Sequence, residues 1–208
     1  MSAGRFITLE GIEGAGKSTV ARFARDWLGA RGVRAVLTRE PGGTPLAERV
    51  RAIVLEPGEE SIAPEAETLL MFAARSIHVQ ELVRPALARG EWVICDRFTD
   101  ATRAYQGGGR GVSADLIEQL AAAVHRDLWP ARTLLLDLPV QEGLQRARGR
   151  PGTLDRFERE RDAFFERVRQ AYLTLAEREP RRIHVIDASR PLDAVQHDVA
   201  AVLETLLL

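Results

Sequence analysis

A short segment near the N-terminus combines glycines, a lysine and a serine in the spacing of a phosphate-binding loop. It reads Gly11-Ile12-Glu13-Gly14-Ala15-Gly16-Lys17-Ser18, followed by Thr19. In a Gly-x-x-x-x-Gly-Lys-Ser loop, backbone N–H groups cradle phosphate oxygens, the lysine reaches the β- and γ-phosphates, and the serine hydroxyl binds Mg²⁺. Lys17 is also the only lysine of the chain. The sequence therefore predicts a site for a nucleoside triphosphate with Mg²⁺ over residues 11–19.

A second pair of candidate residues follows the apolar run 92–95, which ends in Asp96 and Arg97. An acid at the end of a strand is the usual Mg²⁺-directed group of phosphate-loop proteins, although a turn or cap residue is the alternative for Asp96. Arg97 has a planar fork that suits a second phosphate, and its alternative is a surface arginine. We expect Ser18 and Asp96 to hold the metal, and Lys17 and Arg97 to act in catalysis.

An arginine-rich segment over residues 145–156 is a third candidate. Glycines and a proline interrupt its arginines directly after a predicted helix at 140–148. A solvated basic loop is the plainer interpretation. Phosphoryl transfer, however, needs positive charge over the transferred group and exclusion of water, which a closing segment supplies. We therefore expect a mobile lid at about 145–156.

The segment before three consecutive glycines at 107–109 carries groups that could read a base. Thr102, Tyr105 and Gln106 are spaced to share one helical face. A hydroxyl, a phenol and an amide on that face could bind the edge of a base and crowd its sugar. The glycines themselves favour a flexible turn, and they form no second phosphate loop because the lysine is missing.

These groups require a scaffold that brings several strand ends together. Continuous apolar runs predict strands, and helical spacing predicts helices between them. The strands are expected at 5–10, 34–38, 92–96, 133–138 and 183–186, and the helices at about 17–31, 45–55, 64–89, 114–127, 140–148, 155–179 and 191–207. Continuous runs are typical of parallel strands buried on both faces, and ligands bind at the carboxyl ends of such strands. We expect an α/β protein of the P-loop NTPase fold: a five-stranded parallel sheet with helices on both faces and a mobile lid.

Composition limits the remaining possibilities. The 208 residues are 45% hydrophobic and 28% charged, which fits a single domain over residues 1–208. A net charge of −1 argues against a nucleic-acid polymer as partner. No apolar stretch approaches the roughly 20 residues that span a bilayer, and no signal region is recognisable. Because the single cysteine, Cys95, cannot form an internal disulfide, we expect a cytoplasmic protein without a membrane partner.

Together these motifs resemble those of the bacterial thymidylate kinase (dTMP kinase) family. The resemblance rests on residues 10–19, 38–44, 72–75, 96–98 and 104–110, in the family's order and spacing. The similarity of layout extends over essentially the whole chain. It implies ATP-dependent phosphorylation of dTMP to dTDP with Mg²⁺, and homodimers that associate through a helix such as 64–89.

The resemblance also implies roles for residues of the acceptor site. Phe72 would stack on thymine, and Arg75 would contact a base oxygen. Thr102 and Gln106 would help to recognise the base, while Tyr105 would disfavour a ribose 2′-hydroxyl. This chain would therefore select a thymine deoxynucleotide.

A second implied group surrounds the sugar and the phosphates. Glu13 would contact the deoxyribose 3′-hydroxyl, and Arg150 would be the catalytic lid arginine that reaches the transferred phosphoryl group. The remaining expected substrate-binding residues are Arg39, Arg51 and Arg97, around the acceptor phosphate, and Glu40.

The chain departs from the family's pattern in three places. Phe72 lies three residues before Arg75 rather than four, and Met71 occupies the expected position, so either side chain is a candidate to cover the base. Arg103 stands where family members commonly have an uncharged residue. The lid is one residue longer than in close relatives.

Two other classes of function stay open on the sequence alone. One is a different small-molecule kinase of the same architecture, such as a guanylate or shikimate kinase. The other is a nucleotide-gated ATP-binding module without a phosphoryl acceptor. A GTPase switch is disfavoured, because the Asn-Lys-x-Asp guanine motif needs an asparagine and a second lysine, and the chain has neither.

Overall fold

In this computed structural model, residues 4–56, 61–149, 156–157 and 160–207 are described. Their strands form one sheet in the order β2-β3-β1-β4-β5, and all neighbouring strands are parallel. The strands are β1 (Phe6–Glu10), β2 (Ala35–Arg39), β3 (Trp92–Asp96), β4 (Arg132–Asp137) and β5 (Ile183–Asp187). The predicted five-stranded parallel sheet is confirmed, and each strand end lies within one residue of its predicted position.

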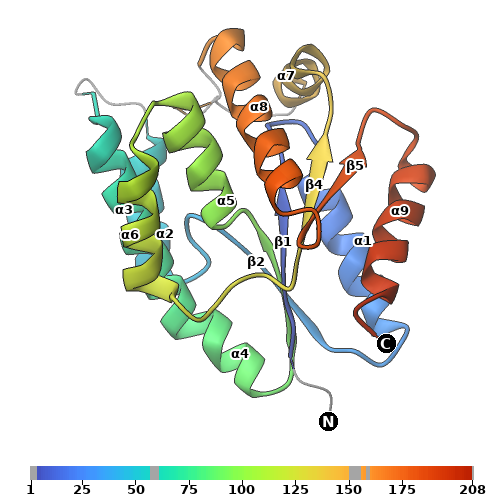
Figure 1. Cartoon of the computed structure of the whole chain (residues 1–208). Coiled ribbons are helices and arrows are strands. Elements are labelled where there is room, and N and C mark those ends of the chain that lie inside the picture. Colours follow the sequence, from blue (N-terminus) through green and yellow to red (C-terminus); the bar gives the residue numbers. More distant parts are fainter. Residues whose placement is uncertain (1–3, 57–60, 150–155, 158–159, 208) are drawn as a thin grey trace.

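Helices cover both faces of this sheet. Figure 1 shows α1 and α9 on one side of it, and α3, α4 and α6 on the other. The helices of the described residues are α1 (Lys17–Gly29), α2 (Pro45–Leu55), α3 (Pro64–His78), α4 (Arg84–Ala88), α5 (Thr99–Thr102), α6 (Ala114–His125), α7 (Val140–Arg148), α8 (Asp162–Arg178) and α9 (Leu192–Glu204), with π-helical turns η1 (Val79–Val83) and η2 (Arg103–Gly109). The α/β layering predicted from the alternation of elements is confirmed.

The long helix predicted at 64–89 is present, but η1 divides it into α3 and α4. Pro85, near the start of α4, has no N–H to donate, and its ring excludes a regular turn before it. A π-helical turn is wider than an α-helical one and commonly occurs where a helix is locally disturbed. The proline therefore explains why the backbone hydrogen bonds change from the α-helical to the π-helical pattern at Val79–Val83.

The flexible turn favoured at the three glycines is wrong, because η2 runs through all of them. The glycines instead allow α8 to approach closely. A Cβ on Gly108 would lie 2.5 Å from the Cβ of Ala171, and one on Gly109 would lie 2.5 Å from the ring of Phe164. Thr102, Tyr105 and Gln106 therefore stand on a helical segment that is fixed against α8.

The central strands of the sheet are buried, and the carboxyl edge of the sheet is charged. All five residues of β1 are buried, and so are the first four of β3. Each strand ends in a charged residue, namely Glu10, Arg39, Asp96, Asp137 and Asp187. Charged groups therefore lie at the carboxyl edge, which is where open parallel sheets bind their ligands. None of the described helices is long and apolar enough to cross a membrane.

Candidate active site

One cavity at the carboxyl edge of the sheet brings together residues from seven segments and Phe157. Its wall contains the phosphate loop, the ends of β2 and β3, and parts of α2, α3, α5 and η2. The described residues of the wall are Glu13, Gly14, Gly16, Lys17, Ser18, Arg39, Glu40, Pro41, Arg51, Leu55, Met71, Arg75, Asp96, Arg97, Phe98, Ala101, Thr102, Tyr105, Gln106 and Phe157. Most predicted site residues are thus neighbours, including the predicted base-reading pair Thr102 and Gln106.

The phosphate loop connects β1 to α1 and requires glycine at position 14. Gly14 has a φ of 75°, and a Cβ there would collide with the carbonyl oxygen of Gly143 in α7. Glycine permits both the left-handed backbone and the close approach of α7. Four predicted members of the nucleotide site belong to the loop or to the first turn of α1 but not to the described part of the cavity wall: Gly11, Ile12, Ala15 and Thr19.

Lys17 lies inside the loop and is only 8% exposed. Its Nζ donates to the carbonyl oxygens of Gly11 and Ile12, at 3.0 Å each. Burial, and then the positive charge of Arg97, lower the pKa of Lys17 to about 8. Because an anionic phosphate is a stronger acceptor than a carbonyl group, it would compete well for this ammonium.

Arg97 occupies a strained turn directly after β3. Its φ of 73° is the only positive value at a non-glycine position in the described residues. Such a conformation costs about 1–3 kcal/mol and is typical of functional sites. The guanidinium Nη2 donates to Glu13 Oε1 at 2.8 Å, whereas Nη1 is buried and has no hydrogen-bond partner among the described residues. Arg97 is therefore held in place with one donor left for a ligand.

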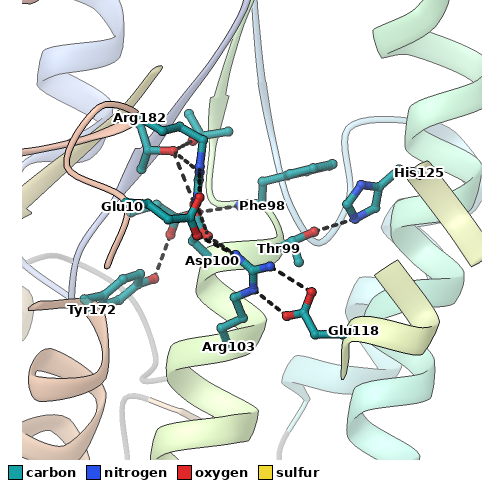
Figure 2. A network of polar contacts seen from close by, with 12 residues as sticks. Glu10, Phe98, Thr99, Asp100, Arg103, Glu118, His125, Tyr172 and Arg182 are labelled. Atoms are coloured by element: carbon teal, nitrogen blue, oxygen red, sulfur yellow. Dashed lines mark hydrogen bonds and ion pairs between the residues drawn. The ribbon is translucent and has the colours of Figure 1, made fainter. Parts of the chain in front are cut away.

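Glu10 fixes this turn, and the sequence analysis assigned it no role. Figure 2 shows its carboxyl group between Phe98 and Tyr172. The Phe98 N–H donates to Oε1 at 2.8 Å, and the Tyr172 hydroxyl donates to Oε2 at 2.7 Å. Burial, and then the negative charge of Asp100, raise the pKa of Glu10 to about 8. The signal available in the sequence was a charged residue at the end of an otherwise apolar buried strand.

Glu13 and Tyr105, the two residues predicted at the sugar, lie together beside Arg97. The Tyr105 hydroxyl donates to Glu13 Oε2 at 2.7 Å, and the guanidinium of Arg97 lies 4.6 Å from the centre of the Tyr105 ring. Burial raises the pKa of Tyr105 well above its usual value. The phenol therefore keeps its proton and acts as a donor.

Arg75 joins the end of β2 to α5. Its Nε donates to Glu40 Oε2 at 2.7 Å, and its Nη2 donates to the Phe98 carbonyl and to Thr102 Oγ1, at 3.0 Å each. Burial raises the pKa of Glu40, but the charge of Arg75 and the hydrogen bond with His78 outweigh it and bring the pKa below its usual value. Arg75 Nη1 is buried without a hydrogen-bond partner among the described residues. Glu40, predicted to bind substrate, thus holds Arg75 with its carboxylate.

Phe72, predicted to stack on a base, points away from the cavity. It is 2% exposed and packs in an apolar cluster with Val112 and Ile117. Successive side chains of a helix point about 100° apart. Met71 therefore belongs to the cavity wall, whereas Phe72 does not. The ring of Phe72 lies 4.6 Å from the guanidinium of Arg75 and supports it. The structure therefore places Met71, the alternative that the spacing left open, in the cavity wall, and Phe72 in the core.

Two further arginines line the same cavity from β2 and α2. Arg39 is exposed and its Nη2 donates to Glu48 Oε2 at 2.9 Å. Arg51 Nη1 donates to the carbonyl oxygen of Pro41 at 2.7 Å. Both arginines thus line the same cavity as Arg97, with which the resemblance groups them around the acceptor phosphate.

Ser18 and Asp96 line the cavity together with Lys17. One hydroxyl and one carboxylate suit Mg²⁺, which keeps several waters and shares its remaining positions with substrate phosphates. No group of three or more His, Cys, Asp or Glu in the described part of the chain could hold a metal alone. The donor set therefore fits a magnesium ion that arrives with a nucleotide. Arg150, the predicted lid arginine, lies outside the described residues.

Two sets of cationic side chains line the cavity. Lys17 serves the phosphate loop, and Arg39, Arg51 and Arg97 form a second set. Two such sets in one cavity of this fold are the arrangement expected of the class of nucleoside monophosphate kinases, which bind a triphosphate and a monophosphate.

Comparison with known proteins identifies the family within this class. A sequence model described as thymidylate kinase matches residues 9–199. The thymidylate kinase of Pseudomonas fluorescens (strain SBW25) is 58% identical over 204 residues, which cover 98% of this chain and 97% of that protein. The thymidylate kinase of Chromohalobacter salexigens is 57% identical over 202 residues, which cover 97% of this chain and 95% of that protein. The chain belongs to the thymidylate kinase family.

A solved structure agrees with this assignment. The crystal structure of thymidylate kinase from Ehrlichia chaffeensis matches with a TM-score of 0.76 and 35% sequence identity, covering 97% of this chain and 99% of that one. The P-loop NTPase fold predicted from the sequence is therefore confirmed.

Proposed function

We propose that this chain transfers the γ-phosphoryl group of ATP to dTMP, giving dTDP and ADP, and that residues 1–208 act as one catalytic domain. Family membership supports the reaction. The observation that carries the proposal is one cavity lined by Lys17, Arg75 and Arg97, in which both arginines have a buried nitrogen without a partner among the described residues. These donors suit a phosphate and a base oxygen.

The acceptor nucleotide is proposed to lie between the arginine set and α5. Arg39, Arg51 and Arg97 would surround its phosphate, and Arg75 Nη1 would donate to a base carbonyl. Met71 would cover the base, and Tyr105 would crowd the 2′ position of the sugar. The pairing of Glu13 with Tyr105 supports this arrangement, because it holds the phenol in the cavity wall.

The transfer requires no strong general base. At neutral pH an oxygen of the acceptor phosphate is already largely anionic, so it can attack the γ-phosphorus in line. One bond forms from that oxygen to the γ-phosphorus, while the bond to the bridging oxygen breaks and its electron pair leaves with ADP. The chain's contribution is positioning and charge neutralisation.

Lys17, Ser18 and Asp96 serve the donor side in this proposal. Lys17 would stabilise the transferred group, while Ser18 and Asp96 would hold Mg²⁺ directly or through water. When bound, the ion neutralises charge on the β- and γ-phosphate oxygens. The lid over 145–156, with Arg150 reaching the transferred group, stays a prediction from the sequence.

A coupled ADP-release assay tests the proposal with dTMP, dUMP, dCMP, dGMP and shikimate as acceptors. We expect Mg²⁺-dependent turnover with dTMP, and loss of turnover in Arg97→Ala. Turnover of dGMP or shikimate without dTMP would assign a different small-molecule kinase. Slow ADP release that is independent of every acceptor would assign a nucleotide-gated binding module instead.

We also propose that the protein acts as a homodimer in the cytoplasm. Leu46 and Ile53 lie seven residues apart on α2 and are 50% and 59% exposed, and Leu69 on the adjacent α3 is 53% exposed. Apolar side chains at this spacing share one helical face, which a second copy would cover. Sedimentation at micromolar concentration tests the dimer, and a monomer there would contradict it. The free thiol of Cys95 suits a reducing compartment.

A further inference from the structure

Behind the base-reading residue Gln106 lies a buried carboxylate on α3. Glu67 is 0% exposed, and its Oε1 accepts a hydrogen bond from Gln106 Nε2 at 2.7 Å. Its Oε2 pairs with Arg156 Nη2, and Arg110 Nε lies 3.6 Å from Oε1. None of the motifs found in the sequence includes Glu67.

This contact determines which end of the Gln106 amide is left for a ligand. A carboxylate flanked by two guanidinium groups accepts hydrogen bonds and donates none. The NH₂ group of Gln106 must therefore turn toward Glu67. Gln106 lines the cavity, so its carbonyl oxygen Oε1 is the polar atom it can offer there.

The same wall holds a donor of fixed orientation. Arg75 is 2% exposed, and its Nε and Nη2 are already bound to Glu40, Phe98 and Thr102. Only Nη1 is buried and unpartnered among the described residues. The wall thus combines one donor, from Arg75, with one acceptor, from Gln106.

We propose that Glu67 is a positioning residue that fixes Gln106 as an acceptor, so that the cavity selects a base edge with a carbonyl oxygen beside an N–H. This inference rests on the proposed function. Thymine presents O4 and N3–H in that pattern, whereas cytosine presents an amino group and an unprotonated ring nitrogen. Each polar group of a cytosine edge would meet a group of the same kind, and a site built to hydrogen-bond one pattern strongly rejects its inverse.

Glu67 also connects Gln106 to the described segment at Arg156. Arg156 Nε donates to the Val54 carbonyl at 2.9 Å, and its backbone N–H donates to the Leu55 carbonyl at 3.1 Å. The carboxylate therefore connects α3, the end of α2 and the segment at Arg156. A purely structural role for Glu67 is the competing explanation, so the test must separate stability from base selection.

The test compares kcat and KM for dTMP and dCMP in wild type, Glu67→Gln and a matched control. An amide at position 67 can donate as well as accept, so Gln106 could then present either end. In Glu67→Gln we expect at least a tenfold lower ratio of kcat/KM for dTMP over dCMP, mainly through a higher KM for dTMP, with kcat at saturating dTMP retained within about threefold. The control Glu160→Gln removes the 2.6 Å ion pair of Glu160 with Arg110. It should leave the ratio unchanged.

A second variant keeps the test valid if Glu67→Gln does not fold. Glu67→Asp retains the charge opposite Arg110 and Arg156 but draws the carboxylate back by one methylene from Gln106. The same loss of preference is expected. An unchanged ratio in the folded variants, with both substrates affected equally, would overturn the positioning role. Absence of dTMP turnover in wild type would instead overturn the proposed function.

Discussion

Arginine serves two different purposes on the two sides of α5. On the cavity side, Arg75 and Arg97 each have a buried Nη1 that lacks a hydrogen-bond partner among the described residues. On the other side, Arg103 and Arg182 use every guanidinium nitrogen on a neighbouring carboxylate or hydroxyl. Figure 2 shows this second group around Asp100.

Asp100 is the centre of the saturated network. It is 2% exposed and accepts from Arg182 at 2.6 and 3.0 Å and from Arg103 at 3.1 Å. Arg103 also donates two hydrogen bonds to the carboxylate of Glu118, and Arg182 also donates one to the hydroxyl of Thr133. The network fastens α5 to α6 and β4. Arg103, which departs from the family's usual uncharged residue, is therefore part of the scaffold.

We infer from this difference that a buried guanidinium nitrogen without a hydrogen-bond partner marks an arginine that binds a ligand. An unmade hydrogen bond on a buried group costs about 1–3 kcal/mol, so it persists where a ligand supplies the partner. The criterion needs the cavity as a second condition. Arg132 Nε is also buried and lacks a partner among the described residues, yet Arg132 does not belong to the described cavity wall.

The largest effect is expected from Lys17→Ala. It removes the only ammonium of the cavity wall, and loss of one preorganised group that stabilises developing charge lowers kcat by about 10²–10³-fold. The thermal midpoint should hardly change, because Lys17 bonds only to loop carbonyls in the described structure. The measurement is dTMP-dependent ADP release by the folded variant. Retained turnover would remove the phosphate loop from the mechanism.

Asp100→Asn tests the network around Asp100, in which every guanidinium nitrogen has a partner, and should lower the free energy of unfolding. Removing one charge of a buried ion-pair network costs about 3 kcal/mol or more, since Arg103 and Arg182 are left undercompensated. Urea unfolding measures the loss in free energy of unfolding, and kcat/KM for dTMP should stay within about threefold at a temperature where the variant is folded. Glu118→Gln is the control. Its carboxylate is 49% exposed, so the loss should be about 1 kcal/mol or less. A large loss of kcat/KM in folded Asp100→Asn would show that the network around Asp100 also serves catalysis, and would contradict its separation from the cavity side.

Arg75→Lys and Arg103→Lys make the same chemical change on opposite sides. Lysine cannot reproduce the fork that reaches Glu40, Thr102 and a ligand together. We expect kcat/KM for dTMP to fall about 100-fold in Arg75→Lys, mainly through KM, which corresponds to about 2.7 kcal/mol. Arg103→Lys should change it by less than about threefold. Equal effects in the two variants would show that unpartnered nitrogens do not distinguish binding from scaffold arginines.

Local patterns predicted the sheet, and they predicted that Lys17, Ser18 and Asp96 would lie together at its carboxyl edge. The phosphate loop, the apolar strands and Asp96 can each be recognised from a few consecutive residues. Such short patterns suffice because backbone conformation and burial leave their signal in neighbouring residues of the sequence. Strand ends were therefore placed within one residue. Parallel order followed from the alternation of strands and helices.

Long-range contacts explain what the sequence did not reveal. Whether Met71 or Phe72 faces the cavity depends on how α3 is rotated against α6, which spacing alone left open. The glycines of η2 looked flexible, because nothing nearby in sequence announces that α8 packs on them. Glu67 had no motif, since its partners Gln106 and Arg156 lie 39 and 89 residues away.

The smallest expected effect is a pH dependence of nucleotide affinity that originates at Lys17. Its pKa is lowered to about 8 by burial and by Arg97, so above pH 8 the free protein increasingly carries a neutral amine. A bound phosphate favours the ammonium and raises that pKa. As pH rises above 8, the Kd for ATP should therefore rise, by at most about tenfold per pH unit.

Calorimetric titration of ATP between pH 7 and pH 9.5 or so measures this effect. Other charged groups act on the Lys17 ammonium, namely Asp96, Glu13 and Glu10. Of these, Glu10 has a pKa raised to about 8 and ionises in the same window. Glu10→Gln removes that titration, and Lys17→Arg keeps a positive charge throughout. The rise in Kd should persist in Glu10→Gln and disappear in Lys17→Arg. If the rise instead disappears in Glu10→Gln, the pH dependence originates at Glu10 and not at Lys17.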